Sequence, residues 1–284
     1  MKYQLLATDM DGTLLDDKKD LSSENIRALE KAHHSGMIVA ICTGRPIHTV
    51  IPYLSQINFP CWLITNNGAV IRNPQQEIIE TCYISDTSLE QVIAILRQDP
   101  ALYFHGSNEK QTYINSRMER LKSLYRFERK SHKGHVKSFL KAMEATWLSK
   151  DYQVVDFKRF VSSGYQLTNI IAISSNTELL ELKRSQMIQM NDVFVTRSGN
   201  DNLEILDHKA TKGNALEKLA QRLKIPREKT VAIGDHDNDI SMLAYAGVGI
   251  AVENATLSLK KHADLVVCTN NHHAVDDALK EING

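Results

Sequence analysis

The first eighty residues alternate between short apolar runs and amphipathic helices, and this alternation constrains the fold more than any other feature. Apolar runs at 3–8, 37–44 and 61–68 are rich in leucine, isoleucine and other strand-forming residues. Residues 22–36 and 46–57, between them, have helical spacing of their apolar positions. Strands that alternate with helices are typical of βαβ units, in which successive strands are parallel. The sequence therefore predicts an α/β fold built on a parallel sheet.

The same pattern returns near the end of the chain, after a long segment of different character. Strand-like and helical runs alternate again from residue 207 onward, whereas segments such as 101–106 and 169–174 have lengths that suit an open, antiparallel sheet. We therefore predict a Rossmann-like doubly wound core formed by residues 1–84 and 207–284. An α+β cap domain, residues 85–206, is inserted into it.

The overall composition argues against several classes of partner. The chain has 34 Lys and Arg against 34 Asp and Glu, so no global field favours nucleic acid or an anionic membrane. The four cysteines form no CxxC pair, which is typical of reduced thiols in a cytosolic protein. No segment is long and apolar enough for a secretory signal or a membrane span. We expect a soluble, cytoplasmic protein that binds neither nucleic acid nor membrane.

Polar clusters follow four of the predicted core strands. They read TDMDGT at 8–13, CTGR at 42–45, TNNGA at 65–69 and GDHDND at 234–239. In an open parallel sheet, ligands bind beyond the carboxyl ends of the strands, where the strand order reverses. The sequence thus predicts that these clusters meet at one edge of the sheet and form a site there.

Two familiar ligand motifs do not fit these clusters. Asp235, Asp237 and Asp239 match the first three ligands of an EF-hand loop, but Ile240 and Ala246 stand where glycine and glutamate are needed. The sequence also lacks the GxxxxGK[ST] pattern of a nucleotide-binding loop. Calcium loops and nucleotide loops are therefore excluded.

The paired acids Asp9 and Asp11 instead suit phosphoryl transfer. Two carboxylates so close together repel each other, so the arrangement is costly unless a cation or a reaction uses them. Hard oxygen ligands suit Mg²⁺, which is usually held by one or two carboxylates, water and a substrate phosphate. A carboxylate can also act as a nucleophile through an aspartyl-phosphate. A second acid two residues further on lies on the same side of an extended chain, within reach of the leaving oxygen.

Four motifs carry a resemblance to a known family. DMDGT at 9–13, CTGR at 42–45, KATKG at 209–213 and GDHDND at 234–239 occur in this order, and together they resemble the haloacid dehalogenase (HAD) superfamily. The large insertion between the second and third motifs is similar to the αβ cap of the Cof-type (IIB) phosphatases. That subfamily implies Mg²⁺-dependent hydrolysis of small phosphorylated metabolites.

The resemblance implies catalytic roles for three residues. Asp9 matches the nucleophile that takes the phosphoryl group. Asp11 matches the acid that protonates the leaving alkoxide and then acts as a base toward water, which requires it to be protonated when substrate arrives. Lys212 matches the lysine that pairs with the nucleophile and with the phosphoryl group.

The resemblance also implies residues that bind phosphate and metal. Thr43, Gly44 and Asn238 match phosphate-binding positions, together with Lys212. The implied Mg²⁺ ligands are the carboxylates of Asp9 and Asp235 and the backbone carbonyl of Asp11.

Three further residues have two interpretations each. Asp239 is either an outer-shell metal ligand or a residue that orients Lys212. Arg45 either contacts substrate or braces its own loop. Asn67 either contacts a ligand or stabilises a turn, and the turn is the favoured interpretation.

We therefore predict a Mg²⁺-dependent phosphatase that acts on sugar phosphates or related phosphomonoesters through an aspartyl-phosphate. The inserted domain is expected to close over the site and to supply specificity. Segment 117–141 has nine Lys or Arg against two Glu, and is either a solvated helix surface or a surface that steers anionic substrates. The alternatives are a phosphosugar mutase-type phosphoryl transferase and a non-catalytic sensor of phosphorylated metabolites.

Overall fold

The computed structural model describes residues 2–131, 135–147, 152–197 and 199–283. The chain divides into two compact units: Met1–Cys82 with Lys209–Gly284, here called the core unit, and Tyr83–His208, here called the inserted unit. The core unit contains every site residue that the sequence predicts.

The core unit is built on one sheet, which among the described residues has eight strands in the order β14-β13-β12-β1-β2-β3-β4-β5. From β14 to β3 neighbouring strands are parallel, whereas β4 and β5 add an antiparallel edge. The expected α/β fold with a parallel core sheet is confirmed. The strands are β1 (Leu5–Thr8), β2 (Ile38–Cys42), β3 (Trp62–Thr65), β4 (Val70–Arg72), β5 (Ile78–Thr81), β12 (Thr230–Gly234), β13 (Val248–Val252) and β14 (Leu265–Val267).

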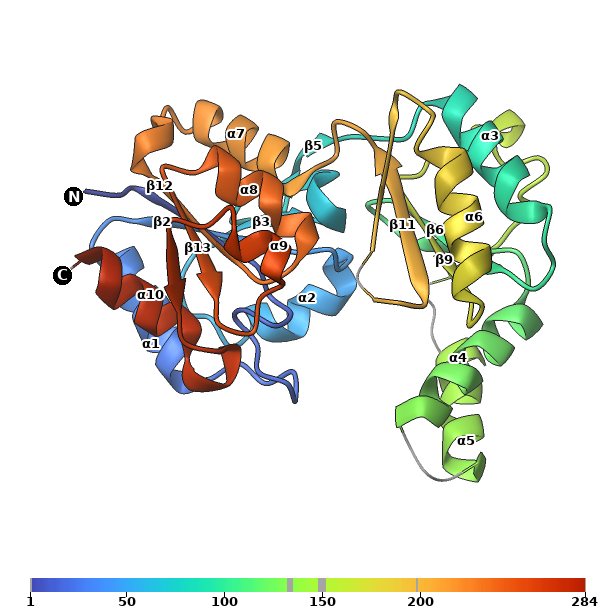
Figure 1. The fold of residues 1–284 in the computed structure, drawn as a ribbon, viewed down its shortest axis with the longest axis horizontal. Coiled ribbons are helices and arrows are strands. Elements are labelled where there is room, and N and C mark those ends of the chain that lie inside the picture. The colour runs from blue at the N-terminus through green and yellow to red at the C-terminus, as the bar shows by residue number, and fades with distance from the viewer. Residues whose placement is uncertain (1, 132–134, 148–151, 198, 284) are drawn as a thin grey trace. The chain divides into compact units, whose positions relative to one another are not determined.

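Helices cover both faces of this sheet, as a doubly wound fold requires. Figure 1 shows α7 and α8 on one side of the sheet and α1 and α10 on the other. Helix α1 begins after a serine cap, with Ser22 accepting a hydrogen bond from the Asn25 N–H. The helices are α1 (Ser23–His34), α2 (Ile47–Leu54), α7 (Lys212–Arg222), α8 (Ile240–Tyr245), α9 (Leu257–Lys260) and α10 (Ala274–Asn283).

The strand order reverses between β1 and β12. From β1 the chain proceeds to β2 and β3 on one side, whereas β12, β13 and β14 extend the sheet on the other. In register, Thr8 at the end of β1 lies between Ile233 of β12 and Ile41 of β2. The residues that follow these three strands therefore start from neighbouring points on one edge.

The inserted unit has its own sheet, whose described strands follow the order β10-β11-β9-β6-β7-β8. Its pairs are antiparallel, as expected, except for the parallel pair β7 and β8. Leu89, Val92, Phe104, Ile170 and Leu180 belong to its separate hydrophobic core. Its elements are α3 (Asp86–Arg97), β6 (Tyr103–Ser107), β7 (Thr112–Ile114), α4 (Arg117–Ser131), α5 (His135–Trp147), β8 (Tyr152–Val154), β9 (Asn169–Ile173), α6 (Thr177–Met187), β10 (Val193–Thr196) and β11 (Asn202–Asp207).

In the basic segment 117–141, the described residues form α4 and the start of α5, and residues 132–134 lie outside the described part of the chain. The side chains of residues 127–137 and 141 lie outside the described part of the chain. The steering surface expected there stays a prediction. Among the described residues, no helix has the length and apolar character that a membrane crossing needs.

The packing of α7 against the sheet yields a stability prediction. Leu216 is fully buried in the core cluster, so Leu216→Ala should lower the free energy of unfolding by about 2–5 kcal/mol through lost contacts and a residual cavity. Urea unfolding followed by circular dichroism measures the change. Leu257→Ala is the matched control, because Leu257 is 79% exposed and its truncation should change stability by less than about 0.5 kcal/mol. Equal effects of the two changes would contradict the packing described here.

Candidate active site

Three aspartates from two loops gather where the strand order reverses. Asp9 directly follows β1, and its N–H donates to the Ile233 carbonyl at 2.9 Å. Asp235 and Asp239 follow β12. One carboxylate oxygen from each of these three aspartates lies within 4.8 Å of those of the other two. Residues 226 positions apart in sequence, Asp9 and Asp235, thus share one site.

Lys212 is buried among these acids. It is the first residue of α7, whose cap Thr211 accepts a hydrogen bond from the Asn214 N–H. The Lys212 Nζ donates to Asp9 Oδ1 at 2.5 Å and to Asp239 Oδ1 at 2.6 Å, and the side chain is fully buried. Burial alone would lower the pKa of Lys212, but the charges of Asp239 and Asp9 outweigh it and raise the pKa. The lysine is therefore held as a cation.

One ammonium does not balance three carboxylates. Burial raises the pKa of Asp9 well above its ordinary value, against the opposing charge of Lys212. Burial, followed by the charge of Asp239, raises the pKa of Asp235 to about 6. A bound cation would lower the free-energy cost of keeping these buried carboxylates ionised. The oxygen donors of Asp9 and Asp235 therefore fit a hard divalent ion.

Gly12 lets the first loop pass close to Asp235. Its φ is 81°, a conformation that favours glycine, and a Cβ there would collide with the Asp235 carboxylate. The Asn254 amide donates to the Gly12 carbonyl at 2.8 Å, and the Thr13 hydroxyl donates to Asp235 Oδ1 at 3.3 Å. The turn after β1 is thus fixed by contacts with segments far away in the sequence.

Asp11 lies in a different environment from Asp9. Arg45 donates to both of its oxygens, with Nε to Oδ2 at 2.6 Å and Nη2 to Oδ1 at 2.7 Å. The Lys19 ammonium is 2.8 Å from Oδ1. Burial raises the pKa of Asp11, but the hydrogen bonds and charges of Arg45 and Lys19 outweigh it and hold the pKa below its ordinary value. These contacts favour the carboxylate form of Asp11, and the proton that it is expected to carry when substrate arrives stays a prediction.

The contact between Lys19 and Asp11 is not predicted by the sequence. It lies in a turn in which Asp16 Oδ1 accepts from the N–H groups of Lys18 and Asp20, and its own φ is 67°. Nothing in the residue types of this loop signals a lysine directed at Asp11. Only the folded turn brings the two charges together.

The predicted phosphate-binding residues form a second group beside the acids. The Thr43 N–H donates to the Ile64 carbonyl at 2.8 Å, and its Oγ1 accepts from the Arg45 N–H at 3.1 Å. A Cβ on Gly44 would lie 3.0 Å from Asn67 Oδ1. That same oxygen accepts from Asn238 Nδ2 at 2.9 Å. Asn67 therefore lies between Gly44 and Asn238.

Both carboxylate oxygens of Asp239 accept hydrogen bonds from neighbouring groups. Besides Lys212, it binds the N–H groups of Asp235 and His236 through Oδ2, at 3.0 and 3.1 Å. These contacts support its interpretation as the residue that orients Lys212. They also fix the turn η4 (Asp237–Asp239), in which Asn238 lies.

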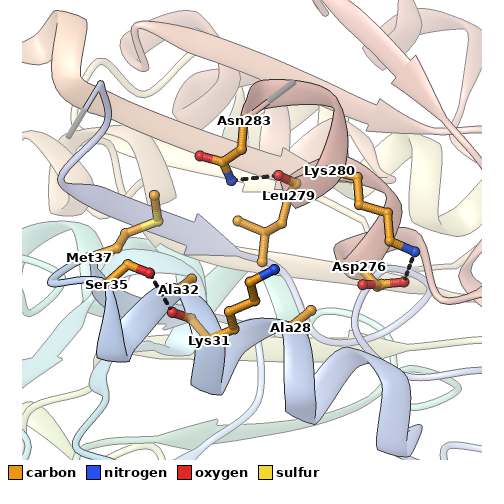
Figure 2. A pocket seen from close by; sticks show the side chains of 9 residues that line it. All are labelled: Ala28, Lys31, Ala32, Ser35, Met37, Asp276, Leu279, Lys280 and Asn283. Atoms are coloured by element: carbon orange, nitrogen blue, oxygen red, sulfur yellow. Dashed lines mark hydrogen bonds and ion pairs between the residues drawn. The ribbon is translucent and has the colours of Figure 1, made fainter.

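A pocket of about 220 Å³ lies elsewhere in the core unit, between α1 and α10. Figure 2 shows Lys31 and Leu279 facing each other across it, while Lys280 is paired with Asp276. None of the predicted site residues lines this pocket. Its lining residues are Ala28, Lys31, Ala32, Ser35, Met37, Asp276, Leu279, Lys280 and Asn283.

Known proteins are similar to this chain in sequence and in fold. The family of haloacid dehalogenase-like hydrolases matches residues 6–279. Phosphatase YwpJ of Bacillus subtilis is 32% identical, with 98% of this chain and 99% of that protein covered. A 5-amino-6-(5-phospho-D-ribitylamino)uracil phosphatase, YwtE of the same organism, is 28% identical over 95% of this chain and 94% of its own. A solved haloacid dehalogenase-like hydrolase from B. subtilis has a TM-score of 0.83 and 31% identity, over 99% of this chain and 100% of that one.

The family match spans nearly the whole chain. The relatives are named phosphatases, and the similarity covers nearly their full lengths. The resemblance inferred from the four motifs is thereby confirmed. This chain belongs to the haloacid dehalogenase-like hydrolase family and is a phosphatase of that family.

Proposed function

We propose that this protein is a Mg²⁺-dependent phosphatase that hydrolyses small phosphorylated metabolites through an aspartyl-phosphate on Asp9. One observation carries the proposal: the Lys212 ammonium lies between Asp9 and Asp239, and Asp235 lies beside them. A cation and several acids around one nucleophilic carboxylate suit the transfer of a dianionic group.

The carboxylates of Asp9 and Asp235 and the carbonyl of Asp11 would hold the divalent ion. When bound, Mg²⁺ would supply positive charge that offsets the repulsion between the phosphoryl group and the acids. The raised pKa of Asp235 and of Asp9 supports a cation at this place, because burial destabilises their ionised forms.

In the first step, an oxygen of Asp9 attacks phosphorus and the bond to the leaving oxygen breaks. Lys212 stabilises the charge on the phosphoryl oxygens, and Asp11 gives its proton to the leaving alkoxide. In the second step, Asp11 takes a proton from water as the water oxygen attacks phosphorus. The bond between the Asp9 oxygen and phosphorus breaks, which releases inorganic phosphate and restores the Asp9 carboxylate. The hydroxyl of Thr43, the N–H of Gly44 and the amide of Asn238 would bind the phosphoryl group.

Asp11 must change its hydrogen-bond partners when substrate binds, before the first step. The pairing with Arg45 and Lys19 favours the carboxylate, which is the form that the second step requires. For the first step Asp11 must gain a proton and give up part of this pairing as substrate binds. Arg45 and Lys19 then become free to meet the negative charge of the substrate.

The substrate class is a small phosphomonoester, such as a sugar phosphate or a related compound. The relative named as a phosphoribitylaminouracil phosphatase supports this, since its named substrate is a small phosphorylated metabolite. We propose that the inserted unit acts as the specificity cap, closes over the site and excludes water. A cytoplasmic setting suits the four cysteines, which are free thiols in the described structure.

Asp9→Asn should abolish turnover. The amide is not a nucleophile, so kcat on a good substrate such as p-nitrophenyl phosphate should fall by at least about 10³-fold. Release of inorganic phosphate measures the rate, and thermal unfolding controls for folding. Wild-type-like turnover in a folded Asp9→Asn protein would rule out the covalent mechanism.

Removal of divalent ions should stop the reaction without unfolding the chain. We expect activity to vanish after treatment with EDTA and to return on addition of Mg²⁺, while circular dichroism stays unchanged. Asp235→Asn should raise the Mg²⁺ concentration needed for half-maximal activity, because one ligand loses its charge. Full activity after exhaustive metal removal would contradict the proposed cofactor.

The products separate hydrolysis from the alternative functions. With a sugar phosphate as substrate, a phosphatase releases inorganic phosphate and free sugar in equal amounts. A mutase would instead give an isomeric sugar phosphate, and a sensor would bind the compound without turnover. Chromatography of the products with a phosphate assay distinguishes the three outcomes.

A further inference from the structure

The short helical turn η1 (Asn66–Gly68) follows β3 in an unusual backbone conformation. Asn66, Asn67 and Gly68 have φ values of 52°, 55° and 103°. Asn66 and Asn67 are each only 2% exposed. Left-handed backbone is unfavourable for residues other than glycine, and such residues concentrate at functional sites. Two buried asparagines in succession therefore call for an explanation beyond chain reversal.

Backbone contacts tie this turn to the loop after β2. The Asn67 N–H donates to the Thr43 carbonyl at 3.0 Å, and the Asn66 N–H donates to the Arg45 carbonyl at 3.2 Å. Gly68 packs so closely on Thr211 and on the start of α7 that a Cβ there would collide with the Thr211 carbonyl. The turn is therefore held between two segments that carry predicted phosphate-binding residues.

The Asn67 side chain points from this fixed turn toward Asn238. Its Oδ1 accepts from Asn238 Nδ2 at 2.9 Å. The Asn238 backbone is fixed independently, because Asp239 is bound by Lys212 and by two N–H groups. These backbone contacts do not fix the rotamer of the half-buried Asn238 side chain.

We propose that Asn67 is a positioning residue that sets the amide of Asn238 for phosphate binding; this rests on the function proposed above. An amide nitrogen has two N–H bonds. One bond is directed to Asn67, so the other is directed away from it and donates to a phosphoryl oxygen. Without Asn67 the amide samples several rotamers, and binding must fix one of them.

Asn67→Gly separates this role from tolerance of the left-handed backbone. Glycine adopts the same φ without strain but has no carboxamide. If Asn67 served only the turn, glycine would replace it without loss. Gln76→Gly is the matched control, since Gln76 also has a positive φ, 66°, but lies in the exposed turn between β4 and β5.

The test measures binding of inorganic phosphate to the full chain with Mg²⁺ by titration calorimetry, which needs no turnover. Asn67→Gly should weaken phosphate binding by about two- to tenfold, the cost of fixing one freed side-chain rotamer on binding, while the melting temperature stays near that of wild type. Gln76→Gly should bind phosphate as wild type does. Asn67→Ala should show the same loss of affinity as Asn67→Gly, with a lower melting temperature from backbone strain. It replaces Asn67→Gly in the binding experiment if the glycine variant does not fold.

A double-mutant cycle with Asn238→Ala tests whether Asn67 acts through Asn238. The double variant Asn67→Gly with Asn238→Ala should bind phosphate no more weakly than Asn238→Ala alone. Additive losses would mean that Asn67 binds the ligand by itself and would overturn the proposal, as would wild-type affinity in Asn67→Gly. With p-nitrophenyl phosphate, Asn67→Gly should raise KM more than it lowers kcat. Inactivity of the wild-type protein and of Gln76→Gly would instead count against the phosphatase function.

Discussion

The buried ammonium of Lys212, bound to Asp9 and Asp239, is the interaction on which the site depends. It connects the end of β1, the start of α7 and the turn after β12, three segments distant in sequence. A buried charge that loses its partner is strongly destabilising, whereas this lysine has two. The same contact holds the predicted nucleophile at a fixed position. Because three acids gather around one lysine, the site retains negative charge that a divalent cation can balance.

Asp9 and Asp11 show how two neighbouring acids acquire opposite properties. Burial raises the pKa of Asp9, while Arg45 and Lys19 lower the pKa of Asp11 despite its burial. Gly12 allows the chain to turn immediately afterwards, so that its backbone passes close to Asp235. The proposed division into a nucleophile and a proton carrier thus has a physical basis in two environments only one residue apart.

Much of the fold was predictable because its signals are local. Apolar runs bounded by turn residues identified β1, β2, β3 and β12, and the serine before α1 identified its start. The residues Ser88 and Gln91 have the spacing of a capping box, which predicts a helix start at Ser88. In the structure Ser85 caps α3 instead, and the Ser88 hydroxyl binds Asp192. A cap motif in sequence does not reveal a partner more than one hundred residues away.

The sequence by itself determined the α/β class and the family, because strand and helix periodicity and short motifs lie in adjacent residues. It also predicted a discontinuous core and the chemistry at Asp9, Asp235 and Lys212, and that chemistry stays a prediction. The tertiary structure alone decided two other sets of contacts: Lys19 and Arg45 with Asp11, and Asn67 with Asn238. These pairings depend on side-chain direction and on loop conformation across the strand-order reversal, and no local pattern of residue types encodes them.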